Sequence, residues 1–135
     1  MDPVGGDTRM LKPHETAFLD AHRVARLATA DKHGTPHLVP VCFVRIETRV
    51  CITIDQKPKL GANLKRLRNI AENPSVALTV DHYDDADWSR LGWLMVRGQA
   101  VILNGGSEHD AAQERLCSKY PQLRSMQLAA LPVIA

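Results

Sequence analysis

Apolar and polar positions divide the chain into a mostly β succession with short helical inserts. Residues 12–22 carry a helical apolar stripe behind an early proline, which predicts a short helix. The runs 23–30 and 36–45 are rich in β-branched and apolar residues, and Asp31-Lys-His-Gly34 between them has the composition of a turn. Two strands around a tight turn predict a β-hairpin.

A further strand and a helix follow this hairpin. Val50–Asp55 alternates cleanly between apolar and polar residues, which predicts a strand with one apolar face. From about Leu60 the apolar residues recur at helical spacing as far as Asn73-Pro74. A proline disfavours helical geometry in the residue before it, so the helix is expected to end there.

The C-terminal half repeats the alternation of strands and helix. The expected elements are a strand over 75–80, an acidic connection over 81–88, a long strand over 91–103, a helix from Ser107 to Lys119 or Tyr120, and the start of a strand within 131–135. Ser107-Glu-His-Asp110 has the arrangement of a capping box, which predicts Ser107 as the residue that caps this helix. Short hairpin connections favour a mainly β fold, a six-stranded antiparallel barrel, over a doubly wound sheet.

Length and composition indicate one soluble domain. The 135 residues fit a single domain over 11–135, preceded by a flexible lead over 1–10. A net charge of +2 is too small for a dedicated nucleic-acid binder, and no apolar run approaches the roughly 20 residues that span a bilayer. Cys42, Cys51 and Cys117 form an odd set without a CxxC motif, so a reducing compartment and a cytoplasmic location are expected.

Familiar catalytic motifs are missing, and the catalytic residues stay unknown. The sequence contains no GxSxG, P-loop, HExxH or GxGxxG motif. The six histidines form no ligand cluster, and His33 and His37, on either side of a turn, are expected to be exposed. No metal site is predicted.

The stretch after Val50–Asp55 predicts an anion site. Lys57 and Lys59 flank Pro58, which stiffens the loop, and the next helix begins shortly afterwards. Lysines and the backbone N–H groups of a helix start together favour a phosphate. For Lys65, Arg66 and Arg68, which follow on the helix, a solvated charged face is the simpler interpretation. A phosphate site without an acid–base set suggests that a bound cofactor supplies the reactivity.

A series of loose motifs in a fixed order resembles a known family. The motifs are Arg26-Leu-Ala-Thr29, Gly34-Thr-Pro-His-Leu-Val-Pro-Val-Cys-Phe43, Lys57-Pro-Lys59, Leu64-Lys-Arg-Leu-Arg-Asn-Ile70, Asn73-Pro74, Val80-Asp-His-Tyr83 and Asp87-Trp88. In this order they resemble the pyridoxamine 5′-phosphate oxidase-like split barrels, and most closely their actinobacterial branch of probable F420 (deazaflavin)-dependent oxidoreductases. The resemblance implies a six-stranded antiparallel split β-barrel of the FMN-binding type. It also implies a homodimer with two cofactor sites at the subunit interface and a small-molecule substrate.

The resemblance also assigns residues to the cofactor. Lys59 aligns with the lysine that holds the cofactor phosphate, and the segment Val39–Val41 aligns with the strand that packs along the flavin-like ring. Trp88 and Trp93 align with positions where the second subunit closes the site. The implied cofactor-binding residues are Val39, Pro40, Val41, Thr53, Ile54, Lys57, Pro58, Lys59, Trp88 and Trp93.

Two alternatives stay open beside an F420-dependent enzyme. The first is an FMN-dependent oxidoreductase of the same fold, and the second is a non-catalytic protein that carries a flavin, a deazaflavin or haem. Oxidation of vitamin B6 phosphates is not expected, because Lys57-Pro-Lys59 replaces the Ser-Arg-Lys-type triplet of those oxidases. No nucleic-acid or membrane partner is predicted.

Overall fold

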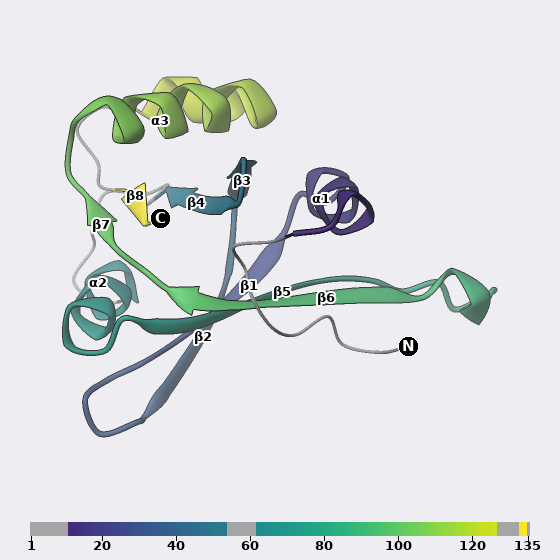
Figure 1. The fold of residues 1–135 in the computed structure, drawn as a ribbon, viewed down its shortest axis with the longest axis horizontal. Helices are drawn as coiled ribbons and strands as arrows, with labels where there is room; N and C mark the ends of the chain where they lie inside the picture. The colour runs from purple at the N-terminus through teal and green to yellow at the C-terminus, as the bar shows by residue number, and fades with distance from the viewer. Residues whose placement is uncertain (1–10, 54–61, 127–132, 135) are drawn as a thin grey trace.

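Two four-stranded antiparallel sheets form the fold of this protein, for which a computed structural model describes residues 11–53, 62–126 and 133–134. The strand order is β2-β1-β5-β6 in the first sheet and β3-β4-β8-β7 in the second (Figure 1). The strands are β1 (Ala25–Ala30), β2 (Pro36–Val41), β3 (Phe43–Ile46), β4 (Arg49–Thr53), β5 (Ser75–His82), β6 (Gly92–Gln99), β7 (Ile102–Leu103) and β8 (Val133–Ile134). The helices are α1 (Pro13–Asp20), α2 (Ala62–Glu72) and α3 (Ser107–Lys119), with short 3-10 helices η2 (Trp88–Arg90) and η3 (Pro121–Met126). The predicted mainly β, split-barrel fold is confirmed.

Two runs of sequence pass from one sheet to the other. β2 continues into β3 after Cys42, and β6 continues into β7 after Ala100 and Val101. A strand that changes sheets turns a corner between them. The runs 36–45 and 91–103 were each predicted as one strand, because their apolar pattern continues through the bend.

The β1–β2 hairpin has the predicted turn. The carboxylate of Asp31 accepts hydrogen bonds from the backbone N–H groups of His33 at 2.8 Å and Thr35 at 3.0 Å. Gly34 has a φ of 84°, a value that favours glycine because a Cβ would be strained there. This turn chemistry fixes the register of the hairpin.

The core consists of two apolar clusters that meet at β4. Leu27, Phe43 and Ile52 belong to the larger cluster, which lies between the sheets. Cys51 and Leu116 belong to the second cluster, beneath α3. Both faces of this strand are therefore buried. Cys51 is only 4% exposed, because α3 packs over that side.

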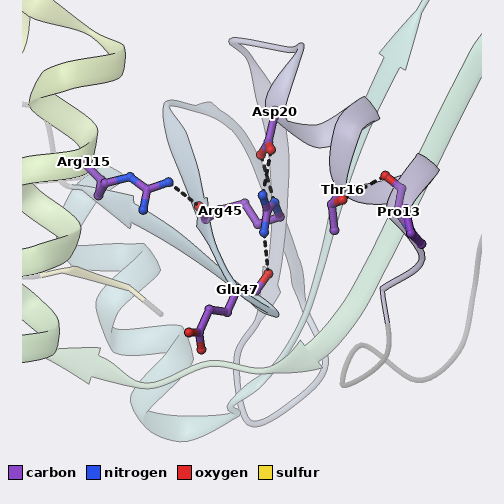
Figure 2. Close-up of polar contacts among 6 residues, drawn as sticks. All are labelled: Pro13, Thr16, Asp20, Arg45, Glu47 and Arg115. Carbon is purple, nitrogen blue, oxygen red and sulfur yellow. Dashed lines mark hydrogen bonds and ion pairs between the residues drawn. The ribbon is translucent and has the colours of Figure 1, made fainter.

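An arginine fork attaches α1 to β3. Nε and Nη2 of Arg45 donate to the two carboxylate oxygens of Asp20 at 2.9 and 2.8 Å, and Nη1 donates to the backbone carbonyl of Glu47 at 2.9 Å (Figure 2). Arg115 of α3 donates to the carbonyl of Arg45 at 3.4 Å. The hydrogen bond from Arg45 lowers the pKa of the Asp20 carboxyl. Arg45 thus joins three parts of the chain, α1 and the turn after β3 through its side chain and α3 through its backbone carbonyl.

The observed end of α2 agrees with the prediction from the sequence, whereas the observed start of α3 differs from it. α2 ends at Glu72, just before Asn73-Pro74, as predicted. α3 is capped by Gly106, whose φ is 98°, and no side chain caps the helix, so the predicted capping role of Ser107 is wrong. Ser107 is already the first helical residue, because the chain turns into the helix one residue earlier at the glycine. No helix of the described ranges is long and apolar enough to cross a bilayer.

Candidate functional site

The outer face of the sheet β2-β1-β5-β6 carries several of the predicted site residues. Pro40, Arg26, Thr79 and Met95 are successive partners across its four strands, and paired residues in a sheet point to the same face. Figure 1 shows α1 and α3 on the opposite side of this sheet. Leu38, on the outer face of β2, is 64% exposed. The outer face therefore presents a mixed apolar and polar surface.

The segment Val39–Val41 is divided between the two faces of the sheet. Pro40 lies on the exposed outer face, whereas Val41 is 7% exposed and belongs to the core, with Val39 packed against it. Among the described strands β2 is the edge of its sheet, a position where a proline is tolerated. A ligand on this side would meet the Pro40 ring and the free backbone edge of β2.

Thr53 lies at the end of β4, next to the end of β2. The register pairs Phe43 with Ile52, so one step further places Thr53 opposite Cys42 at the junction of β2 and β3. Thr53 is 3% exposed, and its hydroxyl has no partner among the described residues. The other predicted phosphate-site residues, Ile54, Lys57, Pro58 and Lys59, lie outside the described residues.

A hollow at the tip of the β5–β6 hairpin contains both predicted tryptophans. This groove has a volume of about 520 Å³ and is lined by Thr79, Asp81, His82, Tyr83, Trp88, Leu91, Gly92 and Trp93. Trp88 and Tyr83 are 69% and 59% exposed. Asp81 pairs with Trp93 across the sheet and forms an ion pair with Arg26 at 2.9 Å. The groove therefore adjoins the row of residues that includes Pro40.

Hydrogen bonds within the hairpin tip hold its shape. The Asp84 carboxylate accepts from the backbone N–H groups of Ala86 at 3.0 Å and Asp87 at 3.2 Å. Asp87 accepts from the Ser89 hydroxyl at 2.6 Å and from its N–H at 3.0 Å, and these bonds lower the pKa of the Asp87 carboxyl. The acidic residues of this loop thus build the turn that presents Trp88.

A buried polar cluster beneath α2 was not predicted. Nδ2 of Asn69 donates to the Thr29 hydroxyl at 3.1 Å, and His37 is the strand partner of Thr29. Arg66 is 6% exposed, so its assignment to a solvated helix face is wrong. Burial lowers the pKa of His37, and the charges of Arg66 and Lys65 lower it further. The cluster brings cations of α2 toward the inner face of β2.

Two patterns in the sequence indicate this cluster. Arg66, Asn69 and Ile70 lie three and four residues apart, so they share one face of α2, and buried Ile70 marks that face as inward. His37 has the same strand parity as Val39 and Val41, so it faces inward too. It was predicted to be exposed because it follows a turn. The structure instead places it within β2, half-buried, with Nδ1 shielded from solvent.

A second cavity is lined by none of the predicted site residues. It has a volume of about 260 Å³ and lies between the sheets, where its inner wall includes Leu27, Leu78 and Ile134. Its walls are mostly aliphatic core side chains. Within the described ranges no group of three or more His, Cys, Asp or Glu residues could hold a metal ion.

Comparison with known proteins gives a family and a fold. The family model described as pyridoxamine 5′-phosphate oxidase matches residues 11–134. A 5a,11a-dehydrotetracycline/5a,11a-dehydrooxytetracycline reductase of Streptomyces rimosus is 37% identical over 95 residues. That stretch covers 70% of this chain and 66% of the reductase, slightly less than two thirds of its length.

Solved structures share the fold at low sequence identity. A conserved hypothetical protein of Mycobacterium tuberculosis superimposes with a TM-score of 0.71 at 17% identity, covering 93% of this chain and 79% of that one. The haem storage protein HutZ of Vibrio cholerae gives a TM-score of 0.70 at 18% identity, covering 92% of this chain and 87% of that one. At this identity the likeness concerns the fold alone.

Proposed function

Since the chain belongs to the pyridoxamine 5′-phosphate oxidase family, we propose that it is a homodimeric, F420-dependent oxidoreductase that acts on a small organic substrate. The observation that carries this proposal is its similarity to the dehydrotetracycline reductase. By analogy, the substrate would be an unsaturated ring compound, with hydride passing from reduced cofactor to substrate.

The residues around the end of β4 fit the anionic part of such a cofactor. The Thr53 hydroxyl is buried without a partner among the described residues, and Lys57 and Lys59 follow it within six residues. Lys65 and buried Arg66 of α2 lie beside His37, nearer the other end of β2. Unsatisfied buried hydroxyls are uncommon, so a phosphate oxygen is a reasonable partner for Thr53.

The protein would bind, orient and desolvate the cofactor. When bound, F420 would supply the hydride from C5 of its deazaflavin ring, and a proton from solvent would complete the reduction of the substrate. Pro40 and the free edge of β2 would position one side of the ring. FMN would use the same phosphate site, whereas F420 has a longer anionic tail and gains more from the cations of α2.

A second copy of the chain would complete the site. The outer face of the sheet β2-β1-β5-β6 presents small and apolar side chains, among them Ala28, Leu38, Ala77 and Met95. Two-fold packing of such a face against itself buries apolar surface on both copies. The groove with Trp88 would then lie close to the partner's copy of β2.

Titration of the purified protein with F420 and with FMN, followed by fluorescence, tests the proposed function. We expect F420 to bind more tightly than FMN. Tighter binding of FMN would favour the flavin enzyme of the same fold, and failure to bind either would refute both. Identification of any ligand that copurifies gives an independent result.

One observation favours a haem carrier as a second candidate. The rings of His22 and His82 lie 6.2 Å apart, and Nδ1 of His22 is 2.6 Å from the carbonyl of Phe18. A carbonyl only accepts, so Nδ1 carries the proton and Nε2 is left with a lone pair for a metal. His82 lines the aromatic groove. Haemin titration would show a shifted Soret band, lost in His22→Gln, if this candidate is correct.

A further inference from the structure

Exposed aromatic rings are concentrated at the tip of the β5–β6 hairpin. The chain has only six Phe, Trp and Tyr residues, and Tyr83, Trp88 and Trp93 all line the same groove. Trp88 is 69% exposed although indole is one of the most favourable side chains to bury. Flat, rigid rings left at the surface of a groove are suited to stacking on another flat ring system.

The same hairpin tip is negatively charged. Two of its four carboxylates form ion pairs with guanidinium groups, Asp81 with Arg26 and Asp84 with Arg90. Asp85 and Asp87 add two further negative charges, so these six residues carry a net charge of about −2.

One of these carboxylates lines the groove, and a second accepts a hydrogen bond from a residue that lines it. Asp81 lines it, with Arg26 at 2.9 Å, and Asp85 accepts a hydrogen bond from the Tyr83 hydroxyl at 2.8 Å. A hairpin tip of net negative charge disfavours an anion in the groove and favours a cation next to its aromatic faces.

Charge is therefore segregated across the molecule. The cations of α2, with buried Arg66, lie at one end of β1 and β2, where Asn69 contacts Thr29. The carboxylates lie at the hairpin tip. An anionic group is favoured beside the first region and disfavoured at the second. A reaction partner in the groove would need the opposite charge or none.

We propose that the aromatic groove binds the second reactant of the enzyme, a flat molecule of several fused rings that bears a protonated amine. This assignment deepens the proposed function and rests on it, because the ligand is a reactant only if the protein is an oxidoreductase. The rings would stack on Trp88 and Trp93, and the amine would lie near Asp81. A volume of about 520 Å³ falls within the usual range for sites of drug-sized ligands.

Calorimetric titration of the cofactor-free protein with three flat probes tests the assignment. In slightly alkaline buffer 9-aminoacridine is a cation, acridine is uncharged and anthracene-9-carboxylate is an anion, while all three have three fused rings. We expect affinity to fall in that order, with the cation bound about tenfold or more tightly than the anion. Added salt should reduce this difference.

Variants separate stacking from charge. Trp88→Ala should weaken binding of 9-aminoacridine and acridine alike, by about tenfold, because both lose a stacking surface. Asp81→Asn should weaken only the cation. Glu114→Gln removes one exposed carboxylate from α3, far along the chain from the groove, and should change neither affinity. Circular dichroism melting confirms that each variant is folded.

Two results would overturn the assignment. One is equal or tighter binding of the anionic probe, and the other is unchanged affinity in folded Trp88→Ala. Because no cofactor and no turnover enter the titration, its outcome is independent of the proposed function. Cation binding combined with failure to bind F420 or FMN would keep the groove and reject the oxidoreductase.

Discussion

At the scale of single residues, buried polar groups carry the most information about the site. Thr53, Arg66 and His37 have little in common in the sequence, yet each has a side chain that is wholly or partly buried, and the Thr53 hydroxyl has no partner among the described residues. Lys57 and Lys59 extend this set only through the sequence, because they lie outside the described residues.

Lys59→Ala tests the phosphate role directly. We expect the affinity for F420 to fall by about tenfold to a hundredfold, the range for loss of one hydrogen bond to a charged group. Fluorescence titration measures it. Lys32→Ala, an exposed lysine of the β1–β2 turn, is the matched control and should bind F420 normally. Equal affinity in both variants would contradict the assignment of Lys59.

Lys119 gives a prediction about stability and pH. Its amine lies 3.9 Å from the centre of the Phe43 ring, and burial lowers its pKa to about 8 from 10.5. Between pH 8 and 10.5 the Lys119 amine is largely protonated in the unfolded chain and largely neutral in the folded protein. The contribution of Lys119 to stability therefore increases as pH rises through this window. Below about pH 8 the group is charged in both states and its desolvation opposes folding.

Urea denaturation of the protein and of Lys119→Gln between pH 7 and 10 measures this linkage. The stability of the natural chain should rise relative to the variant as pH increases, because only the natural chain has this titrating amine. Burial raises the pKa values of Cys51 and Tyr120, so these two groups make stability fall as pH rises. Both groups are present in the natural chain and in the variant, so their effect cancels in the comparison. A difference independent of pH would show that Lys119 titrates normally.

At the scale of elements, the fork between Asp20 and Arg45 is expected to hold α1 in place. Asp20→Asn should lower the free energy of unfolding by roughly 0.5–1 kcal/mol at neutral pH, a value typical of a partly exposed pair. The Arg45 hydrogen bond lowers the pKa of Asp20, so this stabilisation is present above the unfolded value of 3.8 and is lost as acid protonates the folded carboxylate.

Denaturant unfolding at neutral and acidic pH checks this element. The free energies of unfolding of the natural chain and of Asp20→Asn should converge at low pH, where Asp20 itself becomes neutral. Glu114→Gln on α3 serves as the reference for loss of an exposed carboxylate. If Asp20→Asn behaves like this reference at every pH, the fork does not stabilise the packing of α1.

Several elements were predictable from the sequence because local chemistry decides them. The turn at Asp31–Gly34 follows from a carboxylate that accepts backbone hydrogen bonds and from a glycine at positive φ. Asn73-Pro74 ends α2 for an equally local reason. The corner at Cys42 was missed because bending between sheets leaves the apolar pattern intact.

Much of the candidate site depended on tertiary structure and was only partly predictable. Trp88 and Trp93 were named from the resemblance, and the structure adds that one groove contains both. Arg66 was taken for a surface charge because a helical arginine usually is one, and only packing against the barrel buries it. The position of Lys59 relative to these residues stays a prediction.

At the scale of the whole molecule, the outer sheet face leads to a prediction about assembly. Leu38→Glu should convert the proposed dimer into monomers. The two-fold axis of this dimer would place each new carboxylate in the apolar contact between the two outer sheet faces. Light scattering after size-exclusion chromatography measures the mass. Glu114→Arg on α3, another surface, should leave the dimer intact. A natural chain that is monomeric under the same conditions would reject the dimer outright.

The burial of both faces of β4 has a consequence for tolerance to substitution. Cys51 and Ile52 are neighbours, yet each fills a different cluster and neither is more than 4% exposed. In a saturation library scored by survival, an ordinary strand would accept polar side chains at every second position. Here the positions from Cys51 to Thr53 should all reject charged residues, whereas Pro36, Leu38 and Pro40 should tolerate more wherever assembly is not selected. A mutational profile of β4 would therefore look like that of a central strand in a parallel sheet, although the strand lies in a small antiparallel one.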